Sequence, residues 1–439
     1  MATIFEVREC NRLGKSHEAL NLLQNVESKD RYYFYEKAKC YLGLKEYKAA
    51  IVEIDKVIEQ KRDWVGAYSI KVKSLYKLKK FDSIAPVIID LINNSARSKD
   101  RVQAFPVVFN DMLDYRVPEM LVLLGSILEY YRFKLGADDV YCFYRAIVDS
   151  NTGKLAEASD NFKKVSSFSF FGRHSTGALS FRYGDDLKDV VSSESIRDVS
   201  SKIHFHDKSL AGFEFDSVVF VSCDDGYFNI FSDLLLASFS RVVKQKVFHM
   251  HLINPSSEVI EKCESFSDFY DFFNFSSEYK EDAEKIDYAC LRYIRLPDVL
   301  SHYRRTVLVC DMDSCFVSDF DANGLLGGGQ VAIKSDDVCS LHYFPWRSYI
   351  ASFVLFSFSE KVVNLALDIS KFLLHFVSRR DDDYWYVDQT ALFCLLNFYA
   401  ENNNFAFQKI HQTSGIVLVP EARQESKEEF VEKMLSKYC

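Results

Sequence analysis

A continuous apolar run that ends in acidic residues constrains the fold of this 439-residue chain more than any other feature. The run covers residues 217–222, and a helical pattern and a second apolar run at residues 247–253 follow it. Strand, helix and strand in this order predict parallel strands joined by a right-handed crossover. Because ligands bind beyond the carboxyl ends of such strands, we expect four residues there to line a site: Ser222, Asp224, Asp225 and Tyr227.

A third apolar run, residues 306–310, leads directly into Asp311-Met312-Asp313. Residues two apart in an extended segment point to the same face, so the two carboxylates converge at the end of a strand. Their repulsion raises one pKa unless a cation binds between them. Oxygen ligands of this kind suit Mg²⁺ or Mn²⁺, which can also neutralise a diphosphate. Asp311 and Asp313 are therefore predicted metal ligands.

The N-terminal part of the chain contains an internal repeat of 34 residues. The spacing of small and apolar residues across positions 34–57 recurs at 68–88 and again at 142–165. Small side chains at fixed offsets let antiparallel helices approach closely. The pattern resembles the tetratricopeptide repeat, which implies a helical array that presents a concave face to a partner. A generic helical bundle is the alternative, and residues 99–138 are helical in pattern without matching the repeat.

The composition excludes disorder and favours a soluble chain with a large core. Aromatic residues make up 15% of the sequence, with 38 Phe and 25 Tyr, and this much ring surface has to be buried. No apolar run reaches the roughly 18 residues of a transmembrane helix, and acidic residues stand at the start where a signal peptide is apolar. Eleven cysteines without metal-ligand spacing are typical of a reduced, cytoplasmic protein.

Charge is unevenly distributed along the chain. Residues 1–170 carry 27 basic and 23 acidic side chains, whereas the remainder carries 27 basic and 40 acidic ones. The acidic part repels phosphate backbones, so nucleic acid is not expected as a partner. Together these patterns predict an all-α helical repeat domain at 1–170, a connecting segment at 171–214 and an α/β domain at 215–439.

Four short motifs in the second half resemble glycosyltransferases of the GT-A fold, of the glycogenin and lipopolysaccharide-galactosyltransferase type. They occur in the order that this family has, and their positions are 219–227, 289–297, 308–313 and 385–392. The resemblance implies a Rossmann-like nucleotide-diphospho-sugar transferase domain that depends on Mn²⁺ or Mg²⁺. It also implies a nucleotide-diphosphate sugar as donor, preferably a UDP-sugar, and retention of the anomeric configuration.

The resemblance assigns the nucleotide side of the site to the first two motifs. Asp224, Asp225 and Tyr227, with the backbone near Ser222, would hold the base and the ribose. Arg292 would contact the diphosphate or the donor sugar.

The other two motifs would supply the metal and sugar side. Asp311 would bind the metal and the ribose, and Asp313 would bind the metal directly. Asp388 would contact the donor sugar, and Gln389 would lie near the anomeric carbon.

The sequence departs from the family at its C-terminal end. The HxxGxxKPW segment, which gives that family a third metal ligand and a phosphate-binding lysine, is absent. His411 is a candidate third ligand, although a packed or exposed histidine is the simpler interpretation. Lys427 could replace the missing lysine, but the acidic residues around it predict a solvated amphipathic helix.

The favoured function is therefore metal-dependent sugar transfer from a nucleotide-sugar to a protein or glycan acceptor, which the helical repeats help to bind. A haloacid-dehalogenase-type phosphatase is the enzymatic alternative, because residues 307–313 also fit its nucleophile strand, with Asp311 attacking phosphorus. A repeat adaptor without catalytic activity is the third hypothesis.

Overall fold

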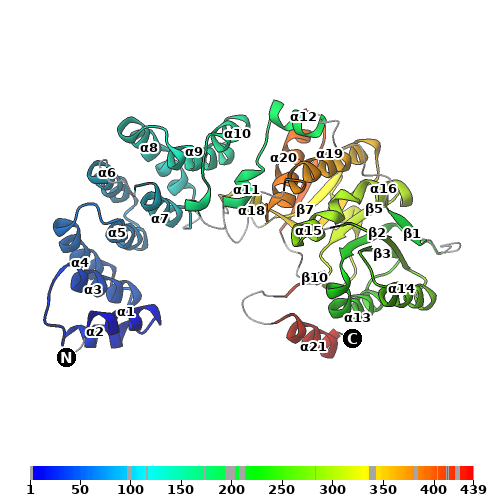
Figure 1. Ribbon diagram of the computed structural model, residues 1–439, viewed down its shortest axis with the longest axis horizontal. Coiled ribbons are helices and arrows are strands. Elements are labelled where there is room, and N and C mark those ends of the chain that lie inside the picture. The colour runs from blue at the N-terminus through cyan, green and yellow to red at the C-terminus, as the bar shows by residue number, and fades with distance from the viewer. Residues whose placement is uncertain are drawn as a thin grey trace. The chain divides into compact units, whose positions relative to one another are not determined.

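The computed structural model describes residues 3–95, 101–114, 117–171, 175–192, 203–206, 213–281, 283–335, 343–379, 384–402, 404–411, 413, 415–420 and 426–438. The chain divides into two compact units. One comprises Met1–Ser175 with Leu341–Tyr343, and the other comprises Thr176–Ser340 with Phe344–Cys439. Figure 1 draws the first unit in blue to cyan and the second in green to red.

The first unit is helical throughout its described residues. Its elements are α1 (Ile4–Arg12), α2 (Ser16–Leu23), α3 (Arg31–Gly43), α4 (Tyr47–Gln60), α5 (Val65–Lys77), η1 (Phe81–Ser83), α6 (Ile84–Ser95), α7 (Arg101–Asp114), α8 (Pro118–Leu135), α9 (Asp139–Asn151), α10 (Leu155–Lys163) and η2 (Ser169–Phe171). Within the runs α1 to α6 and α7 to α10, each α-helix packs against the next one in the chain (Figure 1). The predicted helical character of residues 99–138 is confirmed by α7 and α8.

The helix spacing follows the repeat that the sequence predicts. Helix α5 begins 34 residues after α3, and both α4 and α10 begin 16 residues after the helix that precedes them. Five alanines at the helix contacts are fully buried: Ala38, Ala50, Ala67, Ala146 and Ala158. These small side chains allow the close helix packing. Assignment of the array to the tetratricopeptide type stays a prediction.

The second unit is built on an eight-stranded sheet in the order β1-β4-β3-β2-β5-β8-β7-β9. The strands are β1 (His204–His206), β2 (Ser217–Cys223), β3 (Lys246–Ile253), β4 (Phe273–Glu278), β5 (Thr306–Cys310), β7 (Val331–Ser335), β8 (Tyr349–Phe356) and β9 (Phe407–Ile410). Strands β6 (Cys315–Phe316) and β10 (Val417–Leu418) form a separate antiparallel pair. The predicted strands at 217–222, 247–253 and 306–310 are confirmed as β2, β3 and β5.

Helices cover both faces of the sheet (Figure 1). The helices of this unit are α11 (Thr176–Leu179), α12 (Asp185–Ser192), α13 (Asp225–Val242), α14 (Ser257–Phe269), α15 (Lys285–Ile294), α16 (Leu296–Tyr303), α17 (Ala322–Leu326), α18 (Pro345–Ser348), α19 (Glu360–Val377), α20 (Val387–Asn402) and α21 (Lys427–Tyr438). One face packs against α13 and α14, with α21 on α13, and α15, α16, α19 and α20 lie over the other. All seven residues of β2 are buried because the strand is covered on both faces.

The order in which the chain adds strands to the sheet reverses at the β2–β5 pair. The chain runs outward from β2 through β3 to β4, all parallel, and then returns to place β5 parallel to β2 on its other side. Beyond β5, strand β8 runs antiparallel to both β5 and β7, and β7 pairs parallel with β9. Such a reversal opens a crevice at the carboxyl ends of the two central strands. Asp224 and Asp311 follow these two strand ends.

Part of the predicted connecting segment belongs to the α/β unit instead. Helix α12 packs against α19, α11 packs against α20, and β1 pairs antiparallel with β4. Residues 193–202 and 207–212 of that segment lie outside the described residues. In the part of the chain that the structure describes, no helix is both long and apolar enough to cross a bilayer.

Candidate active site

A cavity of about 640 Å³ lies at the carboxyl ends of β2 and β5, where the strand order reverses. Its volume falls within the usual range for pockets that bind small molecules and cofactors. Eight of the residues predicted from sequence line it: Ser222, Asp224, Tyr227, Arg292, Asp311, Asp313, Asp388 and Gln389. They come from four separate stretches of the chain, which the parallel sheet and its covering helices bring together.

Asp225 does not line this cavity. Asp224 caps α13, because its Oδ1 accepts a 2.8 Å hydrogen bond from the backbone N–H of Tyr227. Asp225, the next residue, turns to the loop before α14, and its two carboxylate oxygens accept from the N–H of Ser256 at 3.3 and 3.1 Å. The structure thus assigns Asp225 a contact that fixes a loop, in contrast to the nucleotide contact that the sequence predicts.

Asp311 and Asp313 both face the cavity from the turn after β5. Arg292 donates from Nη1 to Oδ1 of Asp311, whose side chain is 31% exposed. Burial and the charge of Asp311 raise the pKa of Asp313 to about 7. Within the described residues, no basic side chain forms an ion pair with Asp313, so this carboxylate is poorly compensated.

Arg292 links the aspartate pair to the third acidic residue of the site. Its Nη2 lies 3.4 Å from Oδ2 of Asp388, while Nη1 binds Asp311. Burial alone would lower the pKa of Arg292, but the charges of Asp311 and Asp388 raise it overall. Burial raises the pKa of Asp388 to about 6, against the lowering effects of Arg292 and of the 2.8 Å hydrogen bond from Gln389 N. One guanidinium therefore balances two carboxylates.

Gln389 is anchored by backbone carbonyls on the cavity wall. With its amide oriented so that Nε2 faces acceptors, it donates 2.8 Å hydrogen bonds to the carbonyl oxygens of Trp346 and Tyr349. Trp346 is fully buried and rests directly against Gly177. The hydroxyl of Thr390, next to Gln389, donates to the Gly177 carbonyl at 3.2 Å. This packing fixes Gln389 at the cavity wall.

Helix α15 presents a whole face to the cavity, and the sequence analysis used only one of its residues. Lys285, Tyr288, Ala289 and Arg292 all line the cavity. Their spacing of three, four and seven places them on one side of a helix, which is the signal that could have predicted them. The ammonium of Lys285 lies 4.7 Å from the ring centroid of Trp385, another lining residue that the sequence analysis did not single out.

Lys427 lines the cavity from the C-terminal helix. Its ammonium lies 3.7 Å from the ring centroid of Tyr227 and donates to the Tyr227 hydroxyl. The predicted amphipathic helix is present as α21, with Phe430 and Met434 buried. The expectation that Lys427 is merely solvated is wrong, because the first turn of α21 carries it into the site.

His411 lies elsewhere. It follows β9, is exposed, and does not line the cavity. The described part of the chain contains no cluster of three or more His, Cys, Asp or Glu residues arranged for a metal ion. Mg²⁺ and Mn²⁺ sites that serve phosphate chemistry commonly use one or two carboxylates and complete their shell with water and substrate phosphate. The donor set of Asp311 and Asp313 fits this kind of site.

Comparisons with known proteins reveal partial similarity to glycosyltransferases. No protein-family model and no curated protein matches the chain. Among solved structures, WbbM, described as a bifunctional glycosyltransferase, matches at 16% identity and a TM-score of 0.34, over 45% of this chain and 39% of that one. GlyE of Streptococcus pneumoniae TIGR4 matches at 14% identity and a TM-score of 0.31, over 45% of each chain. Mouse xyloside xylosyltransferase 1 matches at 9% identity and a TM-score of 0.30, over 45% of this chain and 85% of that one.

This chain thus spans less than half the length of WbbM and GlyE. TM-scores between 0.30 and 0.34 mark partial likenesses only. The fold and the site define a helical unit joined to an α/β unit with an acidic pocket at the reversal of its sheet.

Proposed function

We propose that the protein is a metal-dependent glycosyltransferase that takes a sugar from a nucleotide-diphosphate donor. The observation that carries the proposal is the gathering of Asp311, Asp313, Arg292, Asp388 and Gln389 around one cavity at the reversal of a parallel sheet. Paired carboxylates at a strand end suit a divalent cation, and a divalent cation suits a diphosphate. The adjoining cavity is large enough to hold a small organic ligand.

The nucleoside of the donor would lie along the β2 side of the cavity. Ser222 and Asp224 stand at the end of that strand, and Tyr227 offers a ring in the first turn of α13. An aromatic face can stack on a base, and the free oxygen of Asp224 can accept from a ribose hydroxyl. A UDP-sugar is the preferred donor, as the family resemblance implies.

The diphosphate would lie between the aspartate pair and Lys427. Bound at Asp311 and Asp313, Mn²⁺ or Mg²⁺ would neutralise the charge that grows on the diphosphate as the sugar leaves. Lys427 faces the same space from α21, and its positive charge lowers the pKa of Asp313 against the larger effect of burial. An ammonium in this position supplies a charge-assisted hydrogen bond to a phosphate oxygen.

The sugar would lie against α20. Asp388 accepts from sugar hydroxyls or stabilises positive charge on the ring, and its hydrogen bond to Arg292 orients it. Gln389, held through Nε2 by two carbonyls, would direct Oε1 at the reacting carbon. We propose retention of anomeric configuration, which the motif order of the sequence favours.

The phosphatase alternative requires Asp311 to attack phosphorus. The carboxylate of Asp311 accepts a charge-assisted hydrogen bond from Arg292, which weakens it as a nucleophile. This contact therefore favours the transferase over the phosphatase.

We propose that the helical unit binds the acceptor, a protein or a glycan, because stacked helical repeats present an extended concave surface.

A panel of nucleotide-sugars with Mn²⁺ tests the proposal. Release of nucleoside diphosphate by the full chain, lost in Asp313→Ala and on chelation of the metal, is the expected result. Hydrolysis of a phosphomonoester by the same aspartates would support the phosphatase. An absence of metal-dependent thermal stabilisation by any nucleoside diphosphate would contradict the proposal and favour the adaptor.

A further inference from the structure

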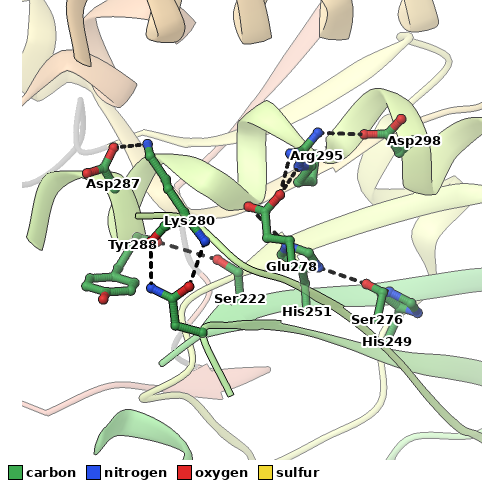
Figure 2. Close-up of polar contacts among 11 residues, drawn as sticks. Ser222, His249, His251, Ser276, Glu278, Lys280, Asp287, Tyr288, Arg295 and Asp298 are labelled. Atoms are coloured by element: carbon green, nitrogen blue, oxygen red, sulfur yellow. Dashed lines mark hydrogen bonds and ion pairs between the residues drawn. The ribbon is translucent and has the colours of Figure 1, made fainter. Parts of the chain in front are cut away.

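Helix α15, which carries Arg292, is held at both ends by ion pairs to the end of one strand. Glu278 is the last residue of β4, and its Oε2 accepts from Arg295 Nε at 2.7 Å and from Arg295 Nη2. Two residues further on, the ammonium of Lys280 donates to Oδ1 of Asp287. Arg295 caps the C-terminal end of α15, and Asp287 lies in its first turn. Figure 2 shows both pairs.

We call these two ion pairs, Glu278–Arg295 and Lys280–Asp287, the clamps of α15. The carboxylate of each clamp is buried. Glu278 and Arg295 are 3% and 5% exposed, and Asp287 is 2% exposed. The second oxygen of Asp287 accepts from the backbone N–H of Glu284 at 2.8 Å, so the carboxylate also caps the helix start. A buried carboxylate oxygen that accepts from two nitrogens of one guanidinium has restricted geometry. Contacts of this kind therefore fix both the height and the rotation of α15.

The segment at the end of β4 that carries Glu278 and Lys280 is itself held by hydrogen bonds and by a histidine. Asn254, just after β3, accepts from Lys280 N at 2.6 Å and donates to Lys280 O at 2.9 Å. His251 Nε2 lies 3.5 Å from the second carboxylate oxygen of Glu278. Burial would raise the pKa of Glu278, but the charges and hydrogen bonds of His251 and Arg295 lower it to about 2. Both neighbours thus favour the ionised form of Glu278, the form that accepts from Arg295.

We propose that Glu278 and Lys280 are positioning residues that set the place of Arg292 in the active site. The two clamped residues of α15 are eight positions apart, about 12 Å along a helix, and Arg292 lies between them. Arg292 reaches Asp311 and Asp388 only if α15 keeps its register. The inference rests on the proposed function, because the charge balance that Arg292 provides is useful there for binding a donor diphosphate.

Cys290 provides a readout that does not depend on activity. It lies on α15 between the clamps, is fully buried, and burial raises the pKa of its thiol well above the ordinary value. A thiol of this kind reacts with iodoacetamide only when the helix opens locally. Cys394 on α20 is equally buried in the same unit and reports opening of the unit as a whole.

The test compares Glu278→Gln and Lys280→Met in the full chain with Asp149→Asn. Asp149 is a matched control, because it is a buried carboxylate that binds Arg145 through two hydrogen bonds on α9 of the helical unit. We expect Cys290 to be labelled about tenfold faster or more in both clamp variants, with Cys394 unchanged. Asp149→Asn should instead speed labelling of Cys142 on α9 and leave Cys290 as in the wild type.

A second arm measures binding of UDP with Mn²⁺ by titration calorimetry. We expect the dissociation constant to rise about tenfold in Glu278→Gln and to stay within about twofold in Asp149→Asn. Arg295→Lys keeps a cation beside Glu278 and should recover part of the binding that Arg295→Met loses.

Three outcomes overturn the proposal. Unchanged labelling of Cys290 would show that the clamps do not hold α15. Equal acceleration of Cys290 and Cys394 would show a loss of general stability. Faster labelling of Cys290 with unaltered UDP binding would show that the clamps do not position Arg292. If the wild type itself binds no UDP, the proposed function fails, while the labelling still decides whether the clamps exist.

Discussion

Arg292 on α15 and Asp388 on α20 form an ion pair in the lining of the cavity, with 3.4 Å between Nη2 and Oδ2. The same guanidinium binds Asp311, so a single cation serves two carboxylates from different parts of the chain. Asp313 is left without such a partner among the residues that the structure describes. Because Asp313 lacks an ion-pair partner in the described part of the chain and lies beside Asp311, which is paired with Arg292, the cavity is suited to bind a further cation.

Replacing Asp313 by asparagine should separate stability from function. Because the pKa of Asp313 is raised to about 7, the folded protein without metal bears an unfavourable charge above that pH. Asp313→Asn should therefore stabilise the metal-free chain at pH 8 by about 1 to 2 kcal/mol, allowing for solvent screening. Urea unfolding in the presence of a chelator measures the change. The stabilising effect should shrink as the pH falls and vanish only below 3.8, where the carboxyl is protonated in the folded and the unfolded chain alike.

The same variant should lose metal-dependent nucleoside diphosphate binding. Removing one of two carboxylate ligands weakens a Mn²⁺ site, and we expect a loss of affinity of about a hundredfold. Calorimetric titration of UDP with and without Mn²⁺ gives the comparison. Wild-type affinity in Asp313→Asn would show that the aspartate pair is not the metal site.

Lys427→Met should weaken donor binding without harming the fold. The ammonium is partly exposed and lies over the Tyr227 ring, so its removal costs little stability. If it contacts phosphate, we expect the KM for the nucleotide-sugar to rise about tenfold. Lys433→Met on the same helix is the control, because Lys433 is exposed and does not line the cavity. Equal kinetics for the two variants would argue against a phosphate contact.

Gly177→Ala should destabilise the α/β unit. An added Cβ would lie 2.2 Å from Cγ of Trp346, whose indole is fully buried. We expect a loss of about 3 kcal/mol from overpacking, measured by denaturant unfolding, and reduced activity, because the Trp346 carbonyl holds Gln389. Gly125→Ala in α8 is the contrast: its new Cβ meets only Val148 at 3.4 Å, and a mid-helix alanine should leave stability equal or higher.

Glu278 should contribute stability that is lost in acid. Its pKa is about 2 in the folded chain and close to 4.5 when exposed, so its contribution is fully present above pH 5 and is lost as the pH falls toward 2. The groups facing it are His251, Arg295 and, through Arg295, Asp298. The difference in unfolding free energy between wild type and Glu278→Gln should shrink by about 3 kcal/mol from pH 6 to pH 2.5. A constant difference across this range would contradict the prediction.

The sequence predicts the strands of the site better than their arrangement. Residues 217–222 and 306–310 are continuous apolar runs, and this local signal is enough to predict β2 and β5. The insertion of the antiparallel strand β8 between β5 and β7 depends on pairing between distant segments, which no local pattern encodes.

Side chains of the site also differ in whether local sequence or contacts between distant segments determine their positions. Asp311 and Asp313 both line the cavity, although they lie in a turn after β5 and not in the extended segment from which the sequence argument started. Asp225 does not line the cavity, since a helix starts there and Asp224 takes the capping position, a preference that the sequence does contain. Lys427 was unpredictable in its contact, because its position follows from how α21 docks on α13.

The packing of Gly177 beneath Trp346 has a practical consequence for dissecting the molecule. A truncated chain that begins near residue 215 would retain both aspartates and every strand from β2 onward. It would nevertheless remove the backbone that packs against the indole and one of the two carbonyl acceptors of the Thr390 hydroxyl, leaving the carbonyl of Tyr386. The shortest autonomous version of the acidic half therefore begins upstream of its own sheet, at the short helix that contains this glycine.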